Sequence, residues 1–144
     1  IWHGLKCLGL GAGDRALVPA YACGSEIDPL IKAGMIVDSY RVLSDLSPDF
    51  EHLATLAETP AKALLVTHYF GFPQPIKRME AFAEQNELVL IEDNSHGIYS
   101  ADEDGRPLGS FGQLGIFSYP KSLPVSDGGC CVFNSPEEMK GTTP

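Results

Sequence analysis

The sequence predicts an α/β fold with a mostly parallel sheet and helices on both of its faces, a three-layer α/β/α arrangement. Short apolar runs alternate with segments in which apolar residues recur three and four positions apart, as in parallel strands covered by helices. Of the 144 residues, 44% are hydrophobic and 20% are charged, the balance of an ordinary globular domain. We therefore expect residues 1–144 to form a single domain with its own core.

The first part of the chain predicts helices and strands separated by glycine and proline. The expected elements are the end of a helix at 2–10, a strand at 16–19, a helix at 25–33, a strand at 36–42 and a helix opened by Pro48. Ser25 is the candidate N-cap of the helix that Gly34 ends. The helix after Pro48 is expected to turn one face to the core, with Phe50, Leu53, Ala54 and Ala57 on it.

The second part predicts a further β-α unit and then a change of pattern. The expected elements are a strand at 63–69, a helix at 75–85, a strand at 88–92, a polar turn at 102–105 and strands at 115–119 and 129–134. The run at 88–92 is typical of a fully buried strand. In the helix at 75–85, the spacing of Ile76, Met79 and Ala83 predicts that they face inward. Residues 136–139 are expected to form the first turn of another helix.

Charge and cysteine content exclude several classes of partner. The net charge is −9 and the basic residues are scattered, so we expect no nucleic-acid partner. No apolar run approaches the roughly 18 residues that span a bilayer, and residues 1–10 lack the basic start of a signal peptide, so we expect a cytoplasmic protein without a membrane partner. The four cysteines form no C-x-x-C pair and are expected to be small buried residues.

Polar residues at the ends of the predicted strands are the candidate site, because ligands of open α/β sheets bind beyond the carboxyl ends of the strands. These residues are His68, Asp93, His96, Ser118 and Lys121. Asp93 ends the buried strand at 88–92. It is interpreted either as a cap of the following turn or as an anion that pairs with a cationic ring nitrogen at the bottom of a pocket.

Lys121 has two interpretations. A lysine after a strand is usually a solvated surface residue. Here, however, apolar strands flank its segment, and Pro120 and Pro124 stiffen it. A lysine confined in this way would be partly desolvated, which lowers its pKa and makes its amine a nucleophile for Schiff-base chemistry.

Seven short motifs follow one another between Leu5 and Phe133. They are Gly11-Ala-Gly-Asp14, Val18-Pro-Ala-Tyr21, His68-Tyr-Phe-Gly71, Ile91-Glu-Asp93-x-x-His96, Gly109-Ser-Phe-Gly112, Phe117-Ser118-x-x-Lys121 and Asp127-Gly-Gly129. In this order and at about these spacings they resemble the DegT-type family of sugar aminotransferases. The resemblance implies the fold of the aspartate aminotransferase superfamily, of which this chain would be the core of the large domain, and pyridoxal phosphate as the cofactor.

The resemblance also assigns roles. Lys121 would hold the cofactor through a Schiff base and then move the substrate proton, and Asp93 would pair with the pyridine nitrogen. Ser118 would offer its hydroxyl to the cofactor phosphate, and His96 would lie against the cofactor. An ionised aspartate keeps the ring nitrogen protonated, so that the ring accepts electrons. His68 fits the motif but receives no role, and a structural histidine is an equally good interpretation.

The sequence departs from the family in two respects. Cys23 stands where family members often have an aromatic residue that stacks on the cofactor, so ring packing would fall to His96. The phosphate-binding turn of the family would precede Ile1, and its small carboxyl-terminal domain would follow Pro144.

By analogy with the family, the reaction would transfer an amino group, with glutamate as donor, to a keto-sugar attached to a nucleotide, and the protein would be a homodimer. The alternative is a catalytically silent fragment or a cofactor-binding remnant of such an enzyme. A metal site made from His68, Asp93 and His96 is a third hypothesis, but it leaves Lys121 unexplained. A phosphoacceptor role for Asp93 is disfavoured, because several elements precede its strand.

Overall fold

The computed structural model describes residues 1–134, which form one six-stranded sheet and four α-helices. The strands are β1 (Arg15–Pro19), β2 (Ile36–Tyr40), β3 (Ala63–Thr67), β4 (Val89–Asp93), β5 (Leu114–Ser118) and β6 (Gly129–Phe133). The helices are α1 (Trp2–Cys7), α2 (Gly24–Lys32), α3 (Phe50–Ala57) and α4 (Ile76–Gln85), with two 3-10 turns, η1 (Tyr69–Gly71) and η2 (Tyr119–Lys121). The helix expected at 136–139 lies outside the described residues.

The sheet has the strand order β2-β1-β3-β4-β5-β6. Neighbouring strands are parallel except for β5 and β6, which form an antiparallel hairpin. The mostly parallel sheet is thereby confirmed. In the register of β3 and β4, Thr67 lies beside Asp93 at the carboxyl ends of both strands.

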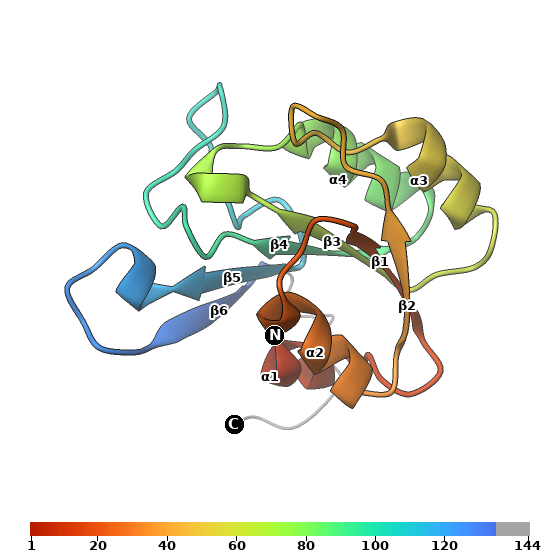
Figure 1. Ribbon diagram of the computed structural model, residues 1–144, viewed down its shortest axis with the longest axis horizontal. Helices are drawn as coiled ribbons and strands as arrows, with labels where there is room; N and C mark the ends of the chain where they lie inside the picture. The colour runs from red at the N-terminus through yellow and green to blue at the C-terminus, as the bar shows by residue number, and fades with distance from the viewer. Residues whose placement is uncertain (135–144) are drawn as a thin grey trace.

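Two hydrophobic cores lie on opposite faces of the sheet, and both faces carry helices, which confirms the three layers (Figure 1). One core lies under α1 and α2 and includes Leu5, Leu30, Val18, Leu65 and Ile91. The other lies under α3 and α4 and includes Leu53, Met79, Leu64, Val66 and Leu90. Along β3 and β4, successive side chains therefore alternate between the two cores, as the pleat of a strand requires.

The connection from β4 to β5 contains no helix. Residues 94–113 instead cross the α3/α4 face as a loop, and Leu108 and Phe111 from this loop are buried in the core there. The loop makes a short antiparallel bridge between Ala101 and Pro107. The layer that a crossover helix would normally supply is therefore partly built from irregular chain.

The beginnings of two helices differ from the sequence expectation. Helix α2 begins at Gly24, and Cys23 is the N-cap in place of Ser25, because the Glu26 carboxylate accepts a hydrogen bond from the Cys23 amide. Helix α3 begins at Phe50, with the Asp49 carboxylate accepting from two amides of the first turn. The inward faces are confirmed for Ile76, Met79 and Ala83, and for Leu53 in α3. Ala54 is exposed, so its expected place on the core face was wrong.

The expectation that all four cysteines are buried was wrong. Cys23 is exposed because it caps α2 at the surface, and Cys7, Cys130 and Cys131 are half-buried. Cys130 and Cys131 lie in β6, which has a strand partner on one side only. All four are free thiols. Within residues 1–134 no helix combines the length and the apolar character that crossing a bilayer requires.

The α3 core contact yields a stability prediction. Leu53 is fully buried, so Leu53→Ala should lower the free energy of unfolding by about 2–5 kcal/mol through lost burial and a residual cavity. The matched control is Leu43→Ala, because Leu43 is 47% exposed and the same substitution should cost less than about 0.5 kcal/mol. Urea denaturation followed by circular dichroism measures both. Equal losses in the two variants would contradict the assignment of this core.

Candidate functional site

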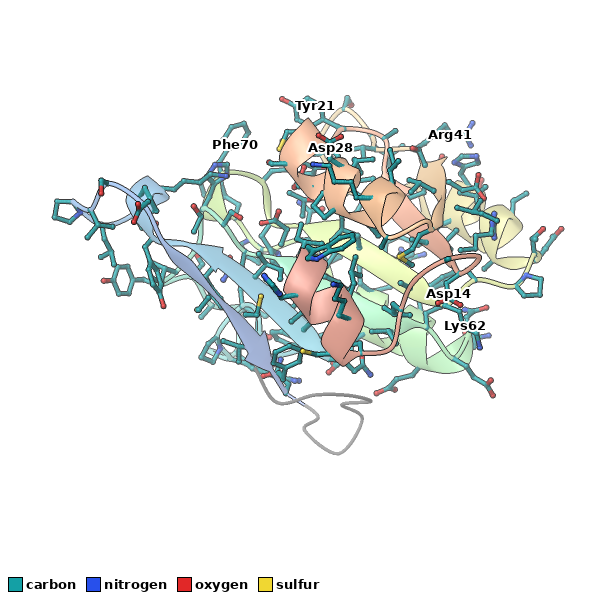
Figure 2. All side chains as sticks on the ribbon, turned by 90° about the horizontal axis from the view of Figure 1, so that it is seen from below. Asp14, Tyr21, Asp28, Arg41, Lys62 and Phe70 are labelled. Atoms are coloured by element: carbon teal, nitrogen blue, oxygen red, sulfur yellow. The ribbon has the colours of Figure 1, made fainter. Side chains whose placement is uncertain are left out.

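A pocket of about 210 Å³ lies beyond the carboxyl ends of β1, β3 and β4. Tyr21 after β1, Thr67 at the end of β3, Asp93 at the end of β4, and Lys121 in η2 are among the residues that line it. Figure 2 shows Tyr21 at this end of the molecule, away from Lys62 at the opposite end of the sheet. The pocket thus occupies the place at which parallel α/β sheets bind their ligands.

Four of the five residues that the sequence proposed at the strand ends, namely His68, Asp93, His96 and Lys121, line this pocket. Asp93, His96 and Lys121 all line it, although they come from β4, the following loop and the β5–β6 hairpin. Ser118 does not line the pocket. It is half-buried at the end of β5 and is the N-cap of η2, the turn that carries Lys121.

Asp93 is 5% exposed and faces the α1/α2 side of the sheet. Its Oδ1 accepts a hydrogen bond of 2.9 Å from the Ser95 amide. The turn-capping interpretation of Asp93 is therefore correct for this oxygen. The same carboxyl group also lines the pocket, and its pairing with a cationic ring nitrogen stays a prediction.

A second carboxyl group, that of Glu26, lies beside Asp93. Glu26 is 6% exposed, and its two oxygens accept hydrogen bonds from the Cys23 amide at 2.6 Å and from the Thr67 hydroxyl at 3.0 Å. Burial raises the pKa of Glu26 above 4.5. The adjacent Asp93 raises that pKa further through its charge and a side-chain hydrogen bond. The pocket therefore contains two interacting carboxyl groups, of which Glu26 favours the neutral form.

Aromatic groups surround the mouth of the pocket. The rings of Phe70 and His96 are stacked, with centroids 6.2 Å apart and planes 8° from parallel. Phe70 holds this position with a backbone φ of 56°, which is uncommon for a residue other than glycine. Cys23, which cannot stack on a ring, is also in the lining. The Phe70–His96 pair is thus the flat surface that the pocket offers.

Lys121 is exposed, so the expectation that its flanking strands desolvate it was wrong. Lys121 is exposed because η2, the turn that carries it, lies in the connection between β5 and β6 (Figure 1). This connection extends away from both helical layers, and most of its residues are exposed. Packing against the flanking strands therefore does not remove solvent from the Lys121 amine.

On the opposite face of β4, the Glu92 carboxylate is fully buried and accepts four hydrogen bonds. The donors are the amides of Gly109, Phe111 and Gly112 at 2.7–2.8 Å, and His68 Nε2 at 3.1 Å. The Gln74 amide donates to Nδ1 of His68 at 3.2 Å, so the proton of this ring lies on Nε2 and points to Glu92. We refer to this arrangement of Glu92, His68 and the three amides as the Glu92 clamp.

The Glu92 clamp favours a charged carboxylate. Burial by itself raises the pKa of Glu92, but the hydrogen bonds from His68, Gly112 and Gly109 outweigh it, and the pKa of Glu92 lies below its ordinary value of 4.5. His68 thereby receives the structural role that the sequence left open. Its buried ring connects the end of β3 to Glu92 and also forms part of the pocket lining.

The metal hypothesis does not match these contacts. His68 directs Nε2 to Glu92 and accepts from an amide at Nδ1, so both ring nitrogens have protein partners. Among the residues that the structure describes, no three His, Cys, Asp or Glu side chains are grouped as metal ligands. His68, Asp93 and His96 thus form no metal cluster.

Sequence reasoning missed both Glu26 and Glu92. A signal existed for Glu92, since a charged residue inside an apolar strand needs a buried partner, and His68 follows the neighbouring strand. For Glu26 the only signal was its position three residues after Cys23, the spacing of a capping box. That spacing gave no indication of the Asp93 contact.

The mostly parallel sheet and the pocket beyond the carboxyl ends of its strands place the chain among the open α/β folds with a ligand site at that edge of the sheet. Residues 1–143 match the model of the DegT/DnrJ/EryC1/StrS aminotransferase family, and the chain belongs to this family.

The chain is similar to two L-glutamine:2-deoxy-scyllo-inosose aminotransferases. It is 30% identical to that of Streptomyces kanamyceticus over 141 residues and 32% identical to that of Streptoalloteichus tenebrarius over 142 residues. Each match covers 92% of this chain and 31% or 32% of the relative, so the chain spans about a third of their length.

Solved structures of aminotransferases are also similar. The aminotransferase TlmJ of Streptoalloteichus hindustanus has a TM-score of 0.84 at 25% identity, covering 95% of this chain and 38% of that one. A family member from Brucella abortus has a TM-score of 0.81 at 27% identity, with 93% and 39% covered. These matches agree with the six-stranded sheet described above.

The Glu92 clamp predicts a specific loss of stability. In Glu92→Gln an amide nitrogen replaces one accepting oxygen and faces a backbone donor, so the free energy of unfolding should fall by on the order of 3 kcal/mol. Because the pKa of Glu92 is lowered on folding, its contribution is present above its ordinary value of 4.5 and is lost as pH falls through the lowered pKa. Urea denaturation at several pH values measures both effects.

The control for this prediction is Glu84→Gln on the exposed side of α4, which should leave stability within about 0.5 kcal/mol of the wild type. A Glu92→Gln variant as stable as this control at neutral pH would show that the clamp contributes nothing.

Proposed function

We propose that this chain is the cofactor-binding part of a pyridoxal-phosphate-dependent aminotransferase, with Lys121 as the residue that holds the cofactor covalently. The observation that carries this proposal is the meeting of Asp93, His96 and Lys121 in one pocket beyond the carboxyl ends of the parallel strands. Membership of the DegT/DnrJ/EryC1/StrS family, whose members are generally pyridoxal-phosphate-dependent, supports it.

The chemistry of the pocket fits this cofactor. A buried carboxyl group suits a protonated ring nitrogen, a flat pair of rings suits an aromatic ring, and a primary amine suits an aldehyde. The volume of about 210 Å³ is below the roughly 300–1,000 Å³ of drug-sized sites, so it accommodates a single ring better than a ring with a sugar. We assign the cofactor phosphate to Ser118, at the start of the turn that carries Lys121.

Pyridoxal phosphate, when bound, supplies an aromatic ring that accepts electrons as the amino carbon of the substrate loses its proton. The residues of this chain have separate tasks around it. Asp93, fixed by the Ser95 amide, keeps a proton on the ring nitrogen. His96, backed by Phe70, holds the plane of the ring. Lys121 would accept and return the proton at the substrate carbon.

We infer that the acceptor is a keto-sugar or a similar cyclic ketone. The two curated relatives are named as aminotransferases of 2-deoxy-scyllo-inosose with L-glutamine. Glutamate, or glutamine as in these relatives, is the proposed donor. A keto-sugar attached to a nucleotide is the narrower form of the same proposal.

A second candidate is a cofactor-binding remnant without turnover, and the exposure of Lys121 favours it for the isolated chain. The reaction with the amino donor alone distinguishes the two functions. An active protein loaded with pyridoxal phosphate changes its absorbance spectrum when glutamate is added, whereas a remnant binds the cofactor and stays unchanged.

We propose that the protein works as a homodimer that covers the mouth of the pocket. Tyr21 and Phe70 line the pocket and are 57% and 65% exposed, and neighbouring exposed rings of this kind often mark a protein–protein contact surface. Phe70→Ser should weaken self-association about tenfold in analytical ultracentrifugation. Tyr99→Ser, at a residue that is 82% exposed and lies outside the pocket lining, should not. A wild type that stays monomeric at every concentration would contradict the proposed dimer.

Borohydride trapping tests the central role of Lys121. After incubation with pyridoxal phosphate and reduction, peptide mass spectrometry should find the cofactor adduct on Lys121 in preference to the other lysines. Lys121→Ala should lose the adduct and the yellow absorbance, and Lys32→Ala, at an exposed lysine of α2, should retain both. Equal labelling of several lysines, or an adduct that survives Lys121→Ala, would refute the assignment.

A further inference from the structure

Glu26 is a buried carboxyl group that neither the family motifs nor the proposed function assigns. It projects from the first turn of α2 towards the ends of β3 and β4, where it meets Thr67 and Asp93. Thr67 and Asp93 lie side by side in the register of the two strands. Successive side chains of a strand point to opposite faces of the sheet. Thr67 and Asp93 therefore point to the same face as Leu65 and Ile91, which is the face that α2 covers, and both lie under Glu26.

A capping role alone does not account for Glu26. Its Oε2 does accept from the Cys23 amide, as the third helical residue of a capping box commonly does. Capping glutamates, however, belong to a residue type that is almost never fully buried without a partner. Glu26 is 6% exposed, and its other oxygen accepts from the Thr67 hydroxyl on the sheet. The side chain is therefore part of the pocket floor as well as of the helix end.

Two carboxyl groups in contact in a buried place cannot both carry charge without a large cost. Within residues 1–134, the titratable groups that interact with Glu26 are Asp93 from β4, Tyr69 after β3, Tyr40 from β2 and Cys23 at the helix start, and none of these four is a cation. Lys121 and His96 line the same pocket and are exposed. One proton shared by the Glu26–Asp93 pair removes the repulsion, and burial of Glu26 favours placing that proton on it.

We propose that Glu26 is a positioning residue for Asp93: its neutral carboxyl group donates a hydrogen bond to the Asp93 carboxylate, so that the pair presents one negative charge to the pocket. The proposal rests on the proposed function in taking Asp93 as the partner of the cofactor ring nitrogen. In this arrangement Asp93 is held from two sides, by the Ser95 amide at Oδ1 and by Glu26. The pocket keeps the single negative charge that a protonated ring nitrogen matches.

The pH dependence of stability has a definite sign. Because the pKa of Glu26 is raised on folding, its contribution is fully present below its ordinary value of 4.5 and is lost as pH rises through the raised pKa. The cofactor-free protein therefore allows a direct measurement. Carbon-13 NMR of labelled glutamate carboxyls follows the titration, and the Glu26 signal is the one that Glu26→Gln removes.

In the cofactor-free wild type the Glu26 signal should titrate above its ordinary value, and Asp93→Asn should lower its midpoint by about 1 pH unit or more, since the charged neighbour is gone. The control is Glu84, an exposed glutamate of α4, whose midpoint should not move in Asp93→Asn. A Glu26 midpoint that Asp93→Asn leaves unchanged overturns the pair, whether or not the chain binds a cofactor.

A double-mutant cycle on pyridoxal phosphate binding tests the positioning role. Glu26→Leu should raise the Kd about tenfold, whereas Glu26→Gln, which keeps a neutral donor, should stay within about threefold of the wild type. In the Asp93→Asn background, Glu26→Leu should change the Kd less than about twofold, because the partner through which Glu26 acts is altered. Equal effects of Glu26→Leu in both backgrounds assign Glu26 to helix capping and overturn the proposal.

The two possible failures are distinguishable. If the wild type shows no binding and no adduct on Lys121, the proposed function fails and the cofactor role of Glu26 fails with it, while the titration still reports the carboxyl pair. If binding and the Lys121 adduct are present but the cycle is additive, only the role of Glu26 fails. Should Glu26→Leu not fold, an unaltered Kd in Glu26→Gln together with a shifted wild-type titration supports the proposal, and a tenfold loss in Glu26→Gln contradicts it.

Discussion

The Glu92 clamp is the interaction on which the site depends. Residues 94–113 form a connection longer than the roughly 12–15 residues beyond which structureless loops are uncommon in compact domains. A single buried carboxylate gathers the amides of Gly109, Phe111 and Gly112 and closes this connection back onto the strand from which it leaves. The approach is so close that a side chain at Gly112 would collide with the Leu90 carbonyl oxygen. The end of β4, and with it Asp93, is thereby fixed without a crossover helix.

The pleat of β3 and β4 then divides the chemistry between the two faces of the sheet. Glu92 and His68 face the α3/α4 side, where they are fully satisfied and serve the fold. Asp93 and Thr67 face the α2 side and line the pocket. Glu92 and Glu26, on opposite faces of the sheet, thus have opposite tendencies: hydrogen bonds from donors lower the pKa of Glu92, whereas burial, together with the neighbouring Asp93, raises the pKa of Glu26.

The sequence was sufficient for what local patterns encode. Apolar periodicity gave the order of strands and helices, and the rule for strand ends selected Asp93, His96 and Lys121, which line one pocket. It failed where the outcome depends on contacts between distant segments. Serine is a more common N-cap residue than cysteine, so the sequence favoured Ser25. The N-cap is Cys23 because its amide donates to the side chain of Glu26, which also contacts the sheet. The exposure of Lys121 was equally invisible, since apolar neighbours in the sequence do not show that the hairpin extends away from the helical layers.

That exposure sets a requirement for the proposed chemistry. Schiff-base formation needs a lysine amine without its proton, and an amine loses its proton more readily when solvent is excluded or another cation is near. In this chain the floor of the pocket is buried through Asp93 and Glu26, while the side that carries Lys121 is open. In the proposed function, solvent would be excluded from the amine by two surfaces that cover the hairpin. One is the cofactor proposed to stack on His96, and the other is the second copy proposed to cover Tyr21 and Phe70. In this proposal the buried carboxyl groups of the pocket floor fix the cofactor ring, and the covering surfaces exclude solvent from the Lys121 amine.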